Sequence, residues 1–211
     1  MVMSDIYPLI LAMLIGLVAG FLNVTAGGGS LLTIPFLNFI GLDLGVANAT
    51  NRVSILVQNL SAIRHYHSKG EINFREALSY VIPAVAGAAA GTLTAVYMPS
   101  KAFRIIAALS ILSMGYLLAA KPKMWEEPKG EPLSMPKRAA VLFAVGIYGG
   151  FLQAGVGFLL IWAISGGCRN NLKDANIFKI VVVAVYTMVS LALFASFGMV
   201  DWHTAFALAV G

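Results

Sequence analysis

The sequence predicts an all-α polytopic membrane protein made of two inverted-topology repeats, with helices that are broken or re-entrant at glycines. Three observations lead to this fold class. Hydrophobic residues form 59% of the chain and charged residues only 11%, against about 25% charged in an average soluble domain. The charges fall in short clusters, separated by intervals long enough to cross a bilayer. The second half of the chain also repeats the pattern of the first.

The first apolar stretch is divided by glycines. No charge occurs between Asp5 and Asp43, an interval of 37 residues that would make roughly 55 Å of helix. This is too long for one span, and the glycines at 27–29 split it into a helix near 6–25 and a shorter one near 30–41. The N-terminus lacks the basic segment of a signal peptide, so we interpret it as a retained helix.

Three more apolar segments complete a first repeat, which we place at residues 1–120. They cover residues 48–62, 77–97 and 102–120. The second of them contains Gly87 and Gly91, at the spacing that lets helix backbones approach closely in lipid. Residues 121–138 combine four prolines with mixed charge and predict a surface linker.

A second repeat is predicted at residues 139–211. Gly146, Gly150, Phe151 and Leu152 repeat the pattern of Gly16, Gly20, Phe21 and Leu22 at a distance of 130 positions, and Gly155 and Gly157 interrupt the run where Gly27 does. After a shift of two positions, Asn176 matches Asn48 and Lys179 stands opposite Asn51. These matches indicate an internal duplication.

The charges of the loops predict that the two copies have opposite orientations. In the first copy, the loop before the third segment carries only Asp43, whereas the loop after it, residues 64–75, is strongly basic. In the second copy, the first of these loops is the basic one, with Arg169 and Lys173, and the second carries only Asp201. Because basic loops stay in the cytoplasm, the copies should face opposite ways, as in many secondary transporters.

The second repeat is incomplete by this comparison. Gly211 aligns with Pro83, and the first copy continues from there to about residue 120. Roughly 40 residues are therefore missing from the second copy. We expect either that the sequence is truncated at its C-terminal end or that a partner chain completes the repeat.

The glycine breaks are the first candidate site. Backbone N–H groups freed at a helix break can bind an anion, and Gly27, Gly28 and Gly29 would let it approach without obstruction by a Cβ. Gly155 and Gly157 provide the counterpart in the second copy. The alternative interpretation is close helix packing, which glycine also permits in membranes.

Polar residues about twenty positions after each break are the second candidate. They are Asn48, Asn51 and Arg52 in the first copy, and Asn176 and Lys179 in the second. Together they offer two cations and several amide donors, a set suited to a small oxyanion. In the alternative interpretation, Arg52 and Lys179 extend to the lipid headgroups, since both lie in the first turns of their helices. Gln58 and Asn59 could also serve only to bridge helices.

Several other classes of function are not supported. His65 and His67 lie on a basic loop without a carboxylate or thiol cluster, so we expect no metal site. Ser30 lacks the following glycine of a hydrolase nucleophile elbow, and no phosphate-loop lysine motif occurs. The spread of the basic residues, which together give a net charge of +5, does not indicate nucleic-acid binding. The single cysteine, Cys168, excludes an internal disulfide. We expect neither an enzyme nor a cofactor.

These segments resemble the TauE/SafE family of membrane permeases, often called sulfite exporters. The matching pieces are GLVAGFLNVTAGGGSLLTIPFL, GVANATNRVSILVQN and KGEINFREAL in the first half, and GIYGGFLQAGVGFLLIWAI, DANIFKIVVVAVY and GMVDWHTAFALAVG in the second. The resemblance implies an all-helical protein of two homologous halves that moves sulfite, sulfonates or related small anions, coupled to an ion gradient. The second break reads GVGF, so the two half-sites should be chemically unequal.

The resulting hypothesis is a secondary transporter, with export as the expected direction, for a small sulfur-containing anion in the prokaryotic inner membrane. Two alternatives stay open at this point. One is an anion channel, and the other is an accessory membrane subunit completed by a partner chain. The expected partners are the anion and the lipid bilayer, and self-association into a homo-oligomer is compatible with the sequence.

Overall fold

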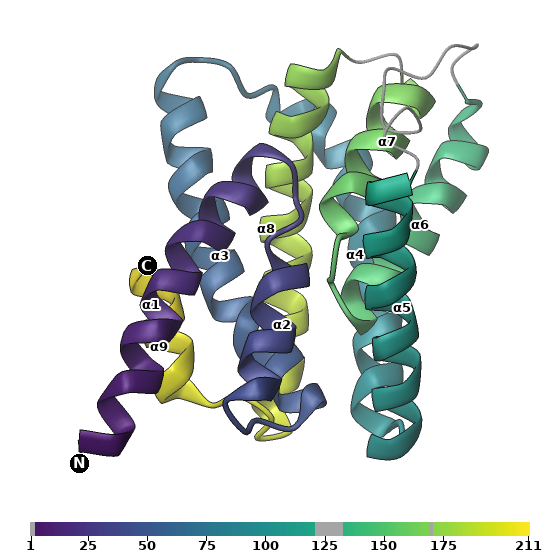
Figure 1. Cartoon of the computed structure of the whole chain (residues 1–211). Coiled ribbons are helices and arrows are strands. Elements are labelled where there is room, and N and C mark those ends of the chain that lie inside the picture. The colour runs from purple at the N-terminus through teal and green to yellow at the C-terminus, as the bar shows by residue number, and fades with distance from the viewer. Residues whose placement is uncertain (1–2, 121–132, 169–170) are drawn as a thin grey trace.

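The computed structural model describes residues 3–120, 133–168 and 171–211 and contains only helices there. The first half comprises α1 (Met3–Thr25), α2 (Ser30–Phe39), α3 (Leu44–Ser68), α4 (Phe74–Tyr97) and α5 (Ser100–Ala120). The second half comprises α6 (Met135–Phe151), α7 (Val156–Cys168), α8 (Leu172–Ser196) and α9 (Trp202–Val210). The all-helical prediction is confirmed. The helices form one bundle with most axes close to parallel (Figure 1).

Four described helices are long and apolar enough to cross a membrane: Tyr7–Thr25 of α1, α4, α5 and α8. The 25-residue α3 is as long as α8, but its first half carries a series of buried polar side chains. Most of the predicted linker lies outside the described residues, and α6 begins four residues before the expected start of the second repeat. Pro136 explains this earlier start, because proline is well tolerated in the first turn of a helix.

Both glycine breaks occur where the sequence places them. Gly27, between α1 and α2, has φ +90°, and Gly155, between α6 and α7, has φ +74°. These left-handed conformations favour glycine. Gln153 adopts φ +61° in the second break, the one positive φ of a non-glycine residue in the described chain. The second break is therefore strained where the first is not.

The glycines also set the packing of helices from different halves. Along the α4–α6 interface, a Cβ on Gly87 or Gly91 would collide with backbone carbonyls of α6. A Cβ on Gly146 or Gly150 would collide in the same way with carbonyls of α4. Gly16 of α1 similarly packs against the backbone of α9. The predicted role of the Gly87–Gly91 pair in close approach is confirmed.

Equivalent parts of the two halves make equivalent contacts. α4 packs against α6 and α1 packs against α9, and α3 lies beside α8 at the centre. The N-caps repeat as well: Asp43 and Asn171 cap α3 and α8, and Asn73 and Asp201 cap α4 and α9. In Figure 1, α1 rises from the N-terminus while α6 descends, and α3 and α8 also run in opposite directions. In an inverted repeat, equivalent helices run in opposite directions, as these two pairs do. The repeat itself remains a prediction.

The described charges are concentrated at one end of the bundle, which we call the basic end. Nζ of Lys173, at the start of α8, lies 3.0 Å from Oε1 of Glu71 in the α3–α4 loop. This ion pair joins two elements of the basic end. The basic residues described there are Arg64, Lys69, Arg75, Lys137, Arg138 and Lys173. The opposite end has Lys101 and Arg104, the latter paired with Asp43 at 3.0 Å. This asymmetry predicts that the basic end faces the cytoplasm.

Candidate substrate site

The C-terminus of α6 is capped by side chains from α3. Arg52 donates through Nη2 to the carbonyls of Gly149 (3.0 Å) and Gly150 (2.6 Å), and through Nη1 to Oε1 of Gln153 (2.7 Å). Asn48, one turn earlier, donates to the carbonyl of Phe151 at 2.8 Å. The last carbonyls of a helix lack intrahelical partners and carry the negative end of its dipole. The buried guanidinium of Arg52 and the amide of Asn48 donate hydrogen bonds to these carbonyls, and the positive charge of Arg52 faces the negative end of the dipole.

The C-terminus of α1 is capped in the same way from α8. The ammonium of Lys179 donates to the carbonyls of Asn23 (2.8 Å) and Val24 (3.3 Å). Each half thus contributes a cation from its third helix to the C-terminus of the other half's first helix. The alternative interpretation, in which Arg52 and Lys179 extend to the lipid headgroups, is wrong, because Arg52 is 0% exposed and Lys179 is 1% exposed.

Asn51 makes different contacts from Lys179, its counterpart in the predicted repeat. Its Oδ1 accepts from the hydroxyl of Thr33 at 2.7 Å, and its Nδ2 donates to Oγ of Ser30 at 3.2 Å. Both partners lie in α2, directly after the first glycine break. Asn51 therefore fixes the first turn of α2 against α3.

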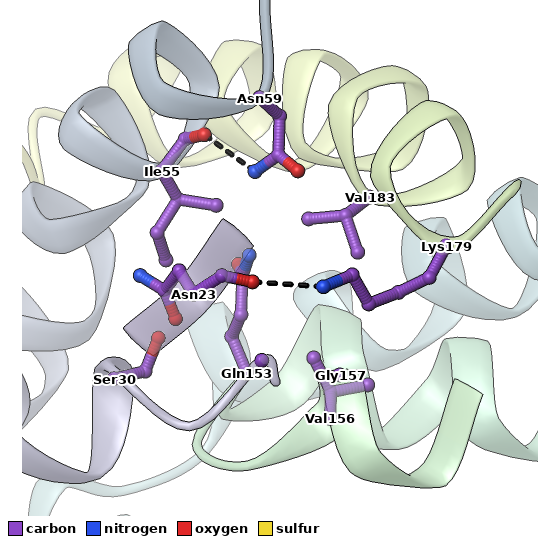
Figure 2. A pocket seen from close by; sticks show the side chains of 10 residues that line it. Asn23, Ser30, Ile55, Asn59, Gln153, Val156, Gly157, Lys179 and Val183 are labelled. Carbon is purple, nitrogen blue, oxygen red and sulfur yellow. Dashed lines mark hydrogen bonds between the residues drawn. The ribbon is translucent and has the colours of Figure 1, made fainter. Parts of the chain in front are cut away.

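A small cavity lies where the two breaks meet, and Figure 2 shows Lys179 extending toward Asn23 across it. Gly27 and Ser30 border it from the first break, and Val156 and Gly157 border it from the second. Its remaining lining consists of Asn23, Ile55, Asn59, Gln153, Lys179 and Val183. The cavity volume is about 10 Å³, roughly the space for one water molecule. This conformation is closed around the cavity.

Helix N-termini border the cavity on both sides. α2 begins at Ser30 and α7 at Val156. In the described chain no hydrogen bond joins the N–H groups of Gly28, Gly29 or Ser30 to another group. Free N–H groups and the positive end of the helix dipole favour an anion at such a place.

The buried charges of the described residues are all positive. Arg52 and Lys179 belong to this set, and no Asp or Glu does. Nε of Arg52 also has no hydrogen-bond partner, although its guanidinium lies 4.9 Å from the ring of Phe194. Both cations donate to helix-end carbonyls, and no buried carboxylate among the described residues neutralises their charge, which is costly within a membrane protein. The site is therefore electrostatically prepared for a negatively charged ligand.

The predicted site residues fall into three groups. Gly27, Gly157 and Lys179 line the cavity. Asn48, Asn51 and Arg52 lie behind its wall and hold α2 and α6. The remaining four do not line it: Gly28 packs against Phe158, Gly29 against α1, Gly155 against Met114, and Asn176 borders a separate hollow.

Four polar lining residues were absent from the predicted site: Asn23, Ser30, Asn59 and Gln153. Asn23 and Gln153 occupy equivalent positions 130 residues apart, each just before a glycine break. That repetition was a usable signal in the sequence. Ser30 carries no such mark, because the equivalent residue of the second break is Leu160.

The fold and the site together define a multi-pass membrane protein with a buried cationic cavity at two helix breaks. The model of the family described as "Sulfite exporter TauE/SafE" matches residues 12–211. The chain belongs to this family. No solved structure matches it.

Relatives with curated names point to the same class of protein. The "Probable membrane transporter protein YfcA" of Escherichia coli K12 is 28% identical over 207 residues, covering 97% of this chain and 77% of the relative. A "Probable membrane transporter protein" of Haemophilus influenzae is 29% identical over 203 residues, covering 93% and 78% respectively. The chain is accordingly a multi-pass membrane transporter of the cell membrane and not an enzyme.

Proposed function

We propose that this transporter exports a small sulfur-containing anion, such as sulfite or a sulfonate, and binds it in the cavity between the two helix breaks. One observation carries the proposal. The cavity brings Lys179 together with the N-termini of α2 and α7, and no carboxylate is buried among the described residues. The name of the family supports sulfur oxyanions and export as the specific choices.

The donors around the cavity suit an oxyanion. A lysine ammonium has three N–H groups, and two of those of Lys179 point at carbonyls of α1, which leaves the third for a ligand. The hydroxyl of Ser30 accepts from Asn51 and keeps its own hydrogen to donate. The free N–H group of Ser30, which lines the cavity at the start of α2, completes a set of donors to which a sulfite or sulfonate oxygen can bind.

The size of the cavity supports a transporter rather than a channel. At about 10 Å³ it holds roughly one water molecule and cannot admit sulfite without a structural change. A conformational step must therefore accompany binding. In the proposed mechanism, one half moves against the other around the meeting point of the breaks, so that the site opens to each side in turn.

Radiolabelled sulfite flux in proteoliposomes tests the proposal. Lys179→Gln should reduce flux by about ten-fold or more, since a charge-assisted hydrogen bond contributes about 1.5–3 kcal/mol. The matched control is Lys173→Gln, which removes the same charge from the same helix at a position where the side chain is 65% exposed. Control flux should equal that of the wild type. Equal flux in the two variants would refute the assigned site, and no flux of any small anion in the wild type would refute the function.

A further inference from the structure

We propose that an open hollow between α1 and α3 is the vestibule through which the anion passes between the cavity and the basic end, and that Asn23 and Gln58 form its gate. This inference rests on the proposed function, because it names the route to the same site. The hollow has a volume of about 510 Å³. Its lining consists of Gly20, Val24, Gln58, Ser61, Ala62, His65 and Tyr66.

The lining of this vestibule suits a hydrated anion. Four of its side chains are polar, and His65 and Tyr66 place its outer part near the C-terminus of α3, at the basic end. A second hollow of about 220 Å³ also opens near this end, but apolar residues make up more of its lining, namely Ala26, Phe158, Ile161, Trp162 and Leu172. Polar donors can replace the water of a passing anion, whereas apolar side chains cannot.

One side-chain hydrogen bond joins the lining of the cavity to the lining of the vestibule. Asn23 lines the cavity and donates through Nδ2 to Oε1 of Gln58 at 2.9 Å, and Gln58 lines the vestibule. Val24 also lines the vestibule, and its carbonyl accepts from Lys179 in the cavity. Breaking the Asn23–Gln58 and Lys179–Val24 hydrogen bonds would connect the cavity with the vestibule.

The seal toward the opposite end is much stronger. Arg52 makes two hydrogen bonds to the end of α6 and a third to Gln153 in the break, and Thr92 joins Gly150 at 3.1 Å and Ser190 at 2.8 Å. Beyond them, the rings of Phe103 and Phe151 pack with centroids 5.1 Å apart. The α1–α2 break is therefore the side that opens more easily from this conformation.

Lys179 links the ligand to this gate. Its ammonium holds the end of α1 through the carbonyls of Asn23 and Val24, and it is also the cation of the site. An anion bound to the third N–H group of Lys179 draws the ammonium toward the ligand and away from those carbonyls. Binding and release of the anion thus alter the contact that keeps the gate closed.

The vestibule is tested by cysteine modification in a Cys168→Ser background, which leaves no other cysteine in the chain. Ser61→Cys is treated with 2-sulfonatoethyl methanethiosulfonate, an anionic reagent that does not cross membranes, and sulfite flux is then measured. The expected result is a loss of flux when the reagent reaches the basic end. Leu172→Cys, at the apolar hollow, is the matched control and should keep its flux after labelling. Full flux in labelled Ser61→Cys would overturn the proposal.

The gate is tested without any need for transport. Ser30→Cys places a thiol in the cavity, where residue 30 is 2% exposed. Adding Gln58→Ala removes the partner of Asn23 and should make labelling of this thiol from the basic end several-fold faster. Thr187→Val removes the Gln153 contact at the opposite seal, which is 3.2 Å long, and should leave that rate unchanged. Equal labelling rates in all three backgrounds would contradict the gate even if sulfite flux supports the function.

Discussion

Gly27 and Gly157 lie in contact, backbone against backbone, at the point where the two broken helices meet. The residues are 130 positions apart and equivalent in the repeat. A Cβ on either glycine would collide with the backbone of the other. The contact places both helix breaks beside one cavity, so that each half supplies one side of the site. The close-packing interpretation therefore holds for this pair, and its role in a binding site remains a prediction.

Gly157→Ala should destabilise the protein by about 2–3 kcal/mol, because the added methyl group has no space between the two breaks. Gly157 does not have a positive φ, so the effect is steric rather than conformational. Gly115→Ala is the control: nothing lies within 4 Å of its added Cβ, and the change should stabilise α5 by roughly 0.5–1 kcal/mol. Thermal unfolding in detergent measures both. Equal midpoints for the two variants would show that the glycine contact is not close in solution.

Arg52→Gln should destabilise the protein by about 3 kcal/mol, since it leaves carbonyls at the end of α6 buried without partners. Arg52→Lys should recover only part of this loss, because one ammonium cannot replace a planar fork that binds three oxygens. Denaturant or thermal unfolding provides the measurement. If Arg52→Lys is as stable as the wild type, the cap on α6 needs charge alone and not the geometry of the guanidinium.

Lys179→Gln should affect stability less than Arg52→Gln, although we expect it to affect transport strongly. Lys179 makes two hydrogen bonds to the end of α1, whereas Arg52 makes two to α6 and a third to Gln153, and Thr92 and Asn48 also contact the end of α6. Unfolding midpoints of the two variants, measured side by side, test this ranking. A larger loss of stability in Lys179→Gln would make Lys179 the main structural cation and weaken its assignment to the ligand.

Arg104→Ala should change stability by less than about 1 kcal/mol. Its ion pair with Asp43 is 3.0 Å long, but the two side chains are 64% and 41% exposed, and such pairs contribute little. Asp43 keeps its separate role as the N-cap of α3, where it accepts from the N–H of Gly45 at 2.9 Å. Asp43→Ala should therefore cost more than Arg104→Ala, about 1 kcal/mol. Unfolding of the two variants and of the double variant separates the cap from the ion pair.

The basic end should face the cytoplasm. In the Cys168→Ser background, Ser68→Cys lies at the C-terminus of α3, and Ser100→Cys lies at the opposite end, at the start of α5. An impermeant thiol reagent added to whole cells should label Ser100→Cys and not Ser68→Cys, and inverted vesicles should give the reverse. Labelling of both sites from the same side would contradict the arrangement of the helices as well as the orientation.

The sequence by itself determined the class of protein, the helical fold and the positions of the breaks. These features depend on local physics: uncharged stretches long enough to cross a bilayer, and glycines that interrupt a helix wherever they fall. The duplication remains a prediction from the sequence, based on matching residues such as Gly27 and Gly157, 130 positions apart, and Asn48 and Asn176, 128 positions apart. The N-caps of α3, α4, α8 and α9 are local features as well, since Asp43, Asn73, Asn171 and Asp201 each accept from an N–H group in the first turn of the helix that follows.

Only the tertiary structure decided which polar residues share a cavity. Asn48, Asn51, Arg52 and Lys179 look alike in the sequence, as polar groups early in an apolar helix. In the bundle, Arg52 meets the end of α6, Asn51 meets α2, and Lys179 lines the cavity. The partners of Arg52 and Lys179 lie about 100 and 156 positions away. No local pattern encodes such contacts, because they arise when helices of different halves pack against each other.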